Sequence, residues 1–160
     1  MRVLGLDPGT ARTGYGVVGL ENGRLVRHTS GVVKLGSGAL APRLATLHAE
    51  LDRIIRAHAP TACAVEGLFH HRNARSALML GHARGVCLFA AAAHGLEVAE
   101  YPPATVKKAL TGHGAAEKHQ VGLMVARLLG AEPESALDAS DALAVAICRL
   151  EDERVLRVYE

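Results

Sequence analysis

Four carboxylates stand where a carboxylate is costly unless it takes part in chemistry. Asp7 ends the apolar run VLGL and is followed by the turn PGTARTG, and Glu66 ends the apolar run ACAV. Asp138 and Asp141 are three residues apart at the start of a predicted helix, so both can project from one face. No block of Lys or Arg stands beside any of the four in sequence. Because an unpaired buried charge is unfavourable, the pattern indicates a cationic partner such as a metal ion.

Ligands that are all oxygen favour Mg²⁺ or Mn²⁺. Two such ions about 3.5–4 Å apart can activate a water and stabilise the leaving oxygen of a phosphodiester. The four carboxylates therefore predict nuclease chemistry. The plainer alternatives are that Asp138 caps its helix, with Asp141 in an acidic first turn, and that Glu66 pairs with a buried Arg.

The length and charge of the chain fit one soluble domain spanning 1–160. The 160 residues carry a formal net charge of +2, but the basic excess lies in residues 1–131, whereas residues 132–160 are acidic. Part of that acidity is the run from Glu151 to Glu153, which we expect to be a solvated helix end.

The cysteines and the absence of targeting signals favour the cytoplasm. Cys63, Cys87 and Cys148 are widely separated, lie in apolar surroundings and match no zinc pattern, so we expect buried thiols in a reducing compartment. No leader precedes Arg2, and we expect no apolar run near the ~20 residues of a membrane helix. The sequence thus predicts a cytoplasmic protein with no membrane contact.

The order of the predicted elements favours an α/β fold with a mixed central sheet of about five strands flanked by helices. Strands are predicted at 3–6, 15–20, 24–35, 62–65 and 98–101, and helices at 40–58, 74–94, 104–111, 117–129 and 138–150. In open α/β sheets, ligand sites lie at the carboxyl ends of the strands, where Asp7 and Glu66 are predicted. If those two strands are neighbours, the carboxylates converge.

The helix predicted at 74–94 has two glycines one turn apart. Gly81 and Gly85 would let another backbone approach closely, either inside the monomer or across a dimer interface.

Four segments, in order over nearly the whole chain, resemble the RuvC family of Holliday junction resolvases. They are GLDPGTARTGYGVV, VEGLFHHRNARSALMLGHARG, YPPATVKKALTGHGAAEKHQV and DASDALAVAI. The resemblance implies a ribonuclease-H-like fold, a homodimer and Mg²⁺-dependent nicking of two opposed strands of a four-way DNA junction. It also implies two ions per active site, with Mn²⁺ as a substitute, and the RuvA–RuvB branch-migration complex as a partner.

Carried onto matching positions, the resemblance assigns roles to individual residues. It makes the four carboxylates the catalytic metal ligands and places Lys107 and Lys118 near the scissile phosphate, where the plainer alternative is a solvated lysine. It implies that Phe69 stacks on bases near the junction, with core packing as the alternative. The remaining expected DNA contacts are polar or basic: His70, His71, Arg72, Asn73, Arg75, Lys107, Lys108 and Lys118.

The predicted function is a structure-specific endodeoxyribonuclease that resolves Holliday junctions in homologous recombination and recombinational DNA repair. Paired, symmetric nicks in two strands of the same polarity would leave ligatable ends. Because one carboxylate cluster supplies one nick, a two-fold dimer is needed, and we place its interface on the 74–94 helix. Alternatives are a catalytically inactive junction-binding protein, a resolvase-like nuclease acting on structured RNA, and an actin-like or sugar-kinase ATPase, which would need a second domain.

Overall fold

The structure is a computed structural model, and it describes residues 1–67 and 73–158, excluding the side chains of residues 155–158. The strands are β1 (Arg2–Asp7), β2 (Arg12–Glu21), β3 (Arg24–Lys34), β4 (Ala62–Glu66) and β5 (Glu97–Tyr101). The helices are α1 (Leu40–His58), α2 (Ala74–Ala93), α3 (Pro103–Thr111), α4 (Lys118–Leu129) and α5 (Leu137–Val158).

The five strands form one mixed sheet in the order β3-β2-β1-β4-β5. β1, β2 and β3 are antiparallel neighbours, whereas β4 runs parallel to β1, and β5 runs parallel to β4. The β2–β3 turn places Asn22 and Gly23 at φ values of 50° and 76°, the left-handed conformation that a two-residue hairpin turn requires. The predicted mixed sheet of about five strands is confirmed.

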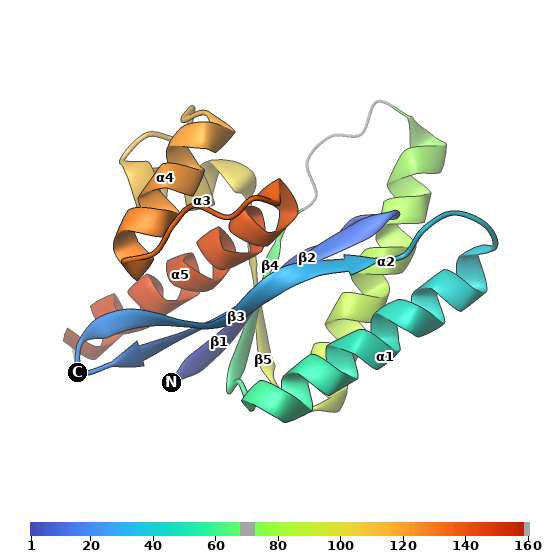
Figure 1. The fold of residues 1–160 in the computed structure, drawn as a ribbon, viewed down its shortest axis with the longest axis horizontal. Coiled ribbons are helices and arrows are strands. Elements are labelled where there is room, and N and C mark those ends of the chain that lie inside the picture. The colour runs from blue at the N-terminus through green and yellow to red at the C-terminus, as the bar shows by residue number, and fades with distance from the viewer. Residues whose placement is uncertain (68–72, 159–160) are drawn as a thin grey trace.

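The alternation of side chains along β1 divides the core into two layers. Val3 faces one way and joins the buried cluster under α3, α4 and α5, whereas Leu4 and Leu6 face the other way and join the cluster under α1 and α2. Figure 1 shows the same arrangement, with α5, α3 and α4 on one side of the sheet and α1 and α2 on the other. The sheet is therefore covered on both faces, and its carboxyl edge is the place left for a site.

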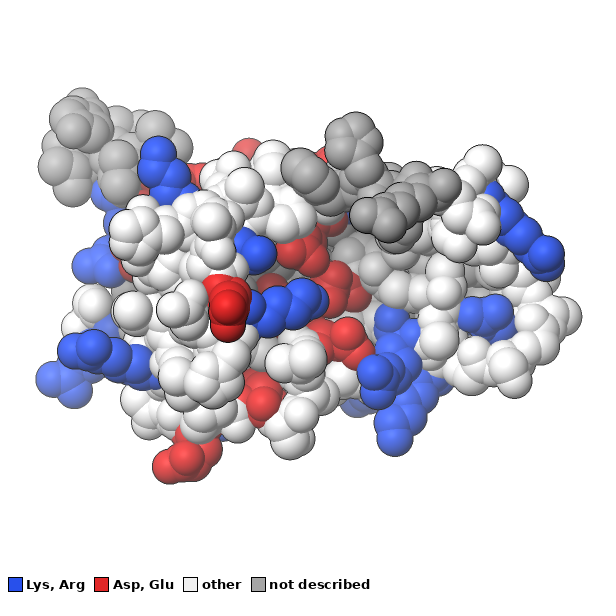
Figure 2. Space-filling view, turned by 90° about the horizontal axis from the view of Figure 1, so that it is seen from above, with Lys and Arg blue, Asp and Glu red and all other residues white. Residues whose placement is uncertain are grey.

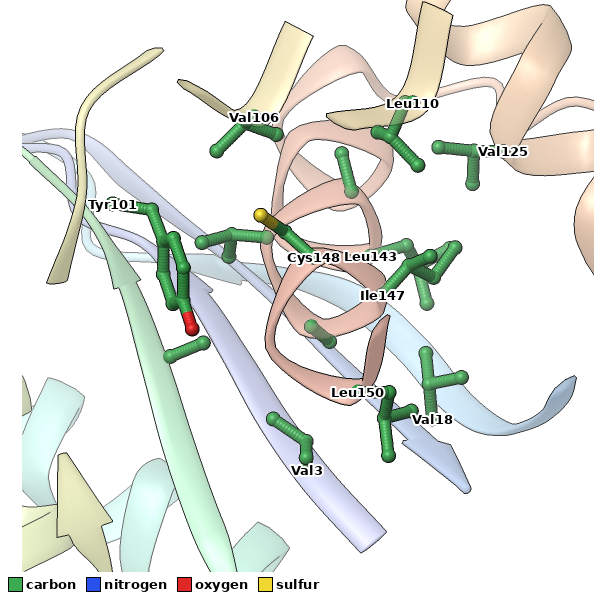
Figure 3. Packing of buried hydrophobic residues seen from close by; sticks show 14 of the residues in the cluster. Val3, Val18, Tyr101, Val106, Leu110, Val125, Leu143, Ile147, Cys148 and Leu150 are labelled. Atoms are coloured by element: carbon green, nitrogen blue, oxygen red, sulfur yellow. The ribbon is translucent and has the colours of Figure 1, made fainter. Parts of the chain in front are cut away.

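Glycines in β1 and β2 allow α5 to lie very close to the sheet. A Cβ atom at Gly5 would collide with the carbonyl oxygen of Ala142, and one at Gly14 would collide with that of Asp138. Leu143 of α5 lies against Gly16 of β2 and belongs to the buried cluster between α5 and the sheet (Figure 3). Gly14 pairs with Asp7 in the β1–β2 register, so close packing brings the first turn of α5 next to the end of β1.

The last helix differs from its predicted bounds. α5 continues through the acidic residues after position 150 and reaches Val158, so the prediction that this run marks a helix end is wrong. Two ion pairs, each between residues about one turn apart, favour its continuation. Arg149 contacts Glu153 at 2.7 Å, and Arg154 contacts Glu151 at 2.9 Å.

α2 is more apolar than predicted from the sequence. By length and composition alone, Ala74–Ala93 could cross a membrane, so the expectation that no segment reaches that limit is wrong. Core helices of soluble proteins pass the same test, and α2 buries a stripe that includes Ala83 and Cys87. It leaves Leu78 and Phe89 65% and 62% exposed. The apolar residues on one face of α2 thus pack against the sheet, whereas those on the other face are exposed.

Replacing Gly14 tests the close packing of α5. Gly14→Ala is expected to lower the free energy of unfolding by about 1–3 kcal/mol, because the added methyl group overpacks against backbone that cannot rotate away. Urea denaturation followed by circular dichroism measures this change.

Gly114→Ala is the matched control. A Cβ there would be 3.4 Å from the carbonyl oxygen of Ala104, an ordinary contact, so a change below about 0.5 kcal/mol is expected. Equal losses of stability in the two variants would contradict the account.

Candidate active site

Asp7 and Glu66 lie side by side at the carboxyl edge of the sheet. Leu6 pairs with Val65 in the parallel register of β1 and β4, so the residue after each is the last of its strand. The two carboxyl groups are joined by a side-chain hydrogen bond. The predicted convergence of these two residues is therefore present in the structure.

Burial and mutual repulsion change the ionisation of this pair. Burial, followed by the charge of Glu66 and the hydrogen bond to it, raises the pKa of Asp7 to about 8, and Asp141 adds to the rise. Burial also raises the pKa of Glu66, which the charge of Asp141 reinforces and the hydrogen bond from Asp7 opposes. Near neutral pH, Asp7 thus holds a proton that it donates to Glu66, because two adjacent carboxylates cannot both be charged at low cost.

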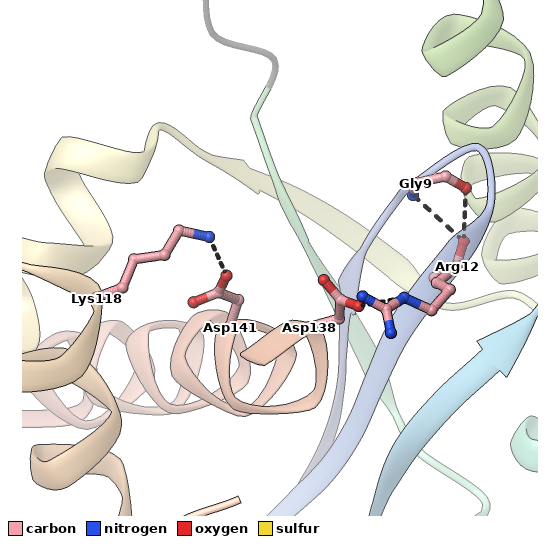
Figure 4. A network of polar contacts seen from close by, with 6 residues as sticks. Gly9, Arg12, Lys118, Asp138 and Asp141 are labelled. Carbon is pink, nitrogen blue, oxygen red and sulfur yellow. Dashed lines mark hydrogen bonds and ion pairs between the residues drawn. The ribbon is translucent and has the colours of Figure 1, made fainter. Parts of the chain in front are cut away.

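The other two predicted carboxylates project from the first turns of α5, and each contacts a cation (Figure 4). Lys118 Nζ lies 2.7 Å from Asp141 Oδ2, and Arg12 Nε lies 3.3 Å from Asp138 Oδ2. Asp138 lies inside the helix and pairs with Arg12, which differs from the capping role weighed as the alternative. Asp141 raises the pKa of both Asp7 and Glu66, so three carboxylates share one field, whereas Asp138 points toward Arg12.

Lys107 and Lys118 lie on the same cleft as the acidic residues. α3 contributes Lys107 and α4 contributes Lys118 to a cleft of about 210 Å³ that Glu66 and Asp141 also line. The hydrogen bond to Asp141 raises the pKa of Lys118, which keeps its ammonium group charged. Figure 2 shows acidic side chains gathered in a hollow of one face, with basic side chains on both sides of it. Such a surface can receive a phosphate backbone while presenting carboxylates to it.

The four carboxylates are suitable ligands for divalent ions, although their side chains are not close enough together in this conformation to surround one. Among residues 1–67 and 73–158, no group of three or more His, Cys, Asp or Glu side chains is close enough together to hold a metal ion. Asp141 contacts Lys118 and Asp138 contacts Arg12, while Asp7 carries a proton. Each of these acids therefore already has positive charge beside it or a proton on it. All four donors are carboxylate oxygens, the ligands that Mg²⁺ and Mn²⁺ prefer, so the residues fit such ions chemically.

The predicted DNA contacts are only partly within the described residues. Phe69, His70, His71 and Arg72 lie outside them, and their roles stay predictions. The Asn73 side chain accepts a hydrogen bond from the Arg75 backbone N–H and caps α2, so it has a structural role. Arg75 and Lys108 are exposed.

Two arginines near the site escaped the sequence analysis. Arg12 pairs with Asp138, and Arg43 of α1 donates to the Thr10 carbonyl in the turn after β1. Arg43 also lines a hollow of about 420 Å³ together with Arg75. Arg12 stands five residues after Asp7 in a glycine-containing turn, and this spacing was the available signal. No local pattern marked Arg43, because its contact spans 33 positions.

Comparison with known proteins identifies the family of this chain. The family model described as crossover junction endodeoxyribonuclease RuvC matches residues 3–149. A protein of that name from Nitratidesulfovibrio vulgaris (strain Hildenborough) is 46% identical over 156 residues, covering 98% of this chain and 94% of that relative. The chain belongs to the RuvC family.

Solved RuvC structures agree with this membership. The structure titled Thermus thermophilus RuvC has a TM-score of 0.89 and 36% sequence identity, covering 97% of this chain and 96% of that one. The T. thermophilus RuvC complex with a Holliday junction substrate has a TM-score of 0.86 and 33% identity at the same coverage. The predicted ribonuclease-H-like fold of the RuvC family is confirmed, and the two-domain ATPase alternative is not supported.

The raised pKa of Asp7 predicts a pH-dependent stability in the absence of metal. An unfolded Asp has a pKa of about 3.9, so the folded protein binds more protons than the unfolded chain between about pH 4 and pH 8. Stability contributed by this group is therefore lost as pH rises through that window. Asp7→Asn, which cannot ionise, is expected to gain stability relative to the natural protein between pH 5 and pH 9.

Thermal unfolding of both proteins in EDTA measures this difference. Comparing the variant with the natural protein at each pH cancels the titration of distant groups. A difference in midpoint that does not grow from pH 5 to pH 9 would contradict the raised pKa of Asp7.

Proposed function

We propose that this member of the RuvC family resolves Holliday junctions in homologous recombination and recombinational DNA repair. It would hydrolyse one phosphodiester in each of two strands of the same polarity and leave ends that a ligase can join. The observation that supports this proposal most is the acidic cluster at the sheet edge, between basic side chains that suit a DNA backbone. Four carboxylates repel the phosphates of DNA, so a surface meant for binding alone would not need them. Their presence favours catalysis.

We further propose that Asp7, Glu66, Asp138 and Asp141 hold Mg²⁺, with Mn²⁺ as a substitute and two ions per active site. Ions bound there would supply Lewis acidity, activating a water and stabilising the leaving oxygen. For these ligands to act together, Asp7 must give up its proton and Asp138 must leave Arg12. Asp7 and Glu66 are held in place by their strands, so little reorganisation of the backbone is required of them.

The two lysines would act on the phosphate. Lys118 is 63% exposed at its side chain although its ammonium group contacts Asp141, so it can turn toward a phosphate in the cleft. Lys107 lies on the wall of the same cleft. Both would neutralise the charge that develops on the phosphate oxygens during hydrolysis. Arg75 and Lys108, both exposed, would contact neighbouring phosphates, and Phe69 would stack on bases.

A homodimer would be formed through α2. Among the residues that the structure describes, no atom outside the helix lies within 4 Å of a Cβ built at Gly81 or Gly85, so packing against the described part of the monomer does not explain these glycines. They line a groove of about 490 Å³ between α1 and α2, beside the exposed ring of Phe89. Two-fold pairing of this face would bury it and would present two carboxylate clusters to one junction.

The protein is proposed to work in the cytoplasm. Cys63, Cys87 and Cys148 are buried and unpaired, as predicted, and burial raises the pKa of Cys87 to about 12. Such thiols fit a reducing compartment. Docking to the RuvA–RuvB branch-migration complex is proposed on family membership alone.

Loss of one carboxylate should separate binding from cutting. Asp7→Asn is expected to bind a synthetic four-way DNA junction with unchanged affinity but to leave its strands uncut in Mg²⁺, because binding depends on the basic surface and cutting on the carboxylates. Gel-shift titration and denaturing gels of labelled strands measure the two properties.

Glu151→Gln is the control for this experiment, since Glu151 lies far along α5 and pairs only with Arg154 among the described residues. It should cut as the natural protein does. Equal cutting by Asp7→Asn would refute the mechanism, and preferential cutting of structured RNA would favour the alternative substrate.

Filling the α2 groove should weaken the dimer. Gly81→Leu is expected to shift the protein toward monomer in sedimentation velocity, because the added side chain holds the paired helices apart. Ala109→Leu, on the exposed surface of α3 in the opposite layer, should stay dimeric. An unchanged dimer in Gly81→Leu would count against this interface.

A further inference from the structure

A buried arginine of α2 contacts the backbone of a catalytic strand. Arg84 lies in the stripe that α2 turns toward the sheet, next to Ala83 and one turn before Cys87, and it is only 7% exposed. The rest of this stripe is Ala or Cys. A charged residue in such surroundings needs partners that compensate for its lost hydration.

Among the described residues, Arg84 has partners in two strands. Nη1 donates to the main-chain carbonyl oxygen of Glu66 at 2.5 Å, and Nη2 pairs with the Glu100 carboxylate of β5. The guanidinium therefore bridges the last residue of β4 and the neighbouring strand. On the other side of the same peptide link, the Gly67 N–H donates to the Tyr101 carbonyl at 2.7 Å. The backbone that carries the Glu66 side chain is thus held from two directions.

Stability alone gives a weak reason for this arginine. Replacing a buried ion pair by apolar side chains of similar volume is often neutral or stabilising. The Glu100 side chain is 55% exposed, so its pairing with Arg84 is partly screened by water. The feature that an apolar residue could not reproduce is the hydrogen bond to the Glu66 carbonyl.

We propose that Arg84 is a positioning residue: it fixes the main chain at Glu66 and thereby the carboxylate that meets Asp7. This inference rests on the proposal that Glu66 helps to hold the metal ions. Arg84 does not touch the reacting atoms. Its effect reaches the site through the peptide of Glu66, because a carboxylate on a loosely held strand end samples more positions and binds an ion less tightly.

Mn²⁺ binding without DNA provides the test, since it is independent of cleavage. Electron paramagnetic resonance of free Mn²⁺ in the presence of the full protein gives the affinity. Arg84→Met keeps the length of the side chain but removes both donors, and it is expected to weaken Mn²⁺ binding by about 10- to 100-fold. Junction affinity without metal should change less than twofold, because the basic surface is intact.

Arg149→Met is the matched control for loss of a buried arginine. Arg149 is 9% exposed and pairs with Glu97 at 3.0 Å and with Glu153 at 2.7 Å. Its removal should lower the thermal midpoint while leaving Mn²⁺ affinity unchanged. A loss of Mn²⁺ affinity as large as that of Arg84→Met would reduce the effect to general destabilisation and overturn the proposal.

Two further variants make every outcome informative. If Arg84→Met does not fold, Arg84→Lys decides: weaker Mn²⁺ binding supports the proposal, and binding equal to the natural protein overturns it. Glu66→Gln separates this inference from the metal site itself. Natural Mn²⁺ affinity in Glu66→Gln refutes the proposed site and the inference with it, whereas a loss there with natural affinity in folded Arg84→Met refutes the role of Arg84 alone.

Discussion

Repulsion among carboxylates that are kept out of water is the constraint on which the site depends. Burial, together with the charges of Glu66 and Asp141, raises the pKa of Asp7 to about 8, so Asp7 retains a proton near neutral pH. This cost arises because neighbouring elements bring the three carboxylates to one edge of the sheet. β1 and β4 are hydrogen-bonded neighbours, and the first turns of α5 are pressed against Gly14. A cluster forced together in this way gains stability from any cation that enters it.

The surrounding cations show how the molecule moderates that repulsion. Lys118 neutralises Asp141 and Arg12 neutralises Asp138, each from an element that differs from that of its partner. The Arg12 and Lys118 side chains are exposed, so each can leave its carboxylate and contact another group. Arg84 is different, since it is buried and holds a backbone atom. The outer face of the same helix carries Gly81 and Gly85, so α2 connects the proposed dimer interface to the strand of Glu66.

Sequence patterns predicted the convergence of Asp7 and Glu66 better than they predicted the contacts of individual side chains. Asp7 and Glu66 could be paired in advance because both end apolar strands, and the parallel neighbours of an α/β sheet share an edge. Whether the two strands are neighbours was left open by the sequence, and the parallel pairing of β1 with β4 comes from the structure. The ion pairs of Asp138 and Asp141 were not predicted, because Arg12 and Lys118 reach these carboxylates through tertiary packing. The contact of Arg84 with the Glu66 main-chain carbonyl arises in the same way.

The helix bounds failed for a related reason. Glu151 and Glu153 are polar enough to suggest a helix end, but their pairing with Arg154 and Arg149 stabilises further turns of α5. α2 is apolar over most of its length, so its composition alone does not distinguish its two faces. Only the structure separates the face of α2 that meets the sheet from the face that is uncovered.

Anomalous diffraction from crystals grown with Mn²⁺ tests the central claim most directly, because it locates the ions without reference to activity. The account predicts anomalous density bounded by the carboxylates of Asp7, Glu66 and Asp141, with the hydrogen bond between Asp7 and Glu66 replaced by contacts to the ion. Well-ordered carboxylates with no anomalous density between them, and with that hydrogen bond intact at saturating Mn²⁺, would contradict it.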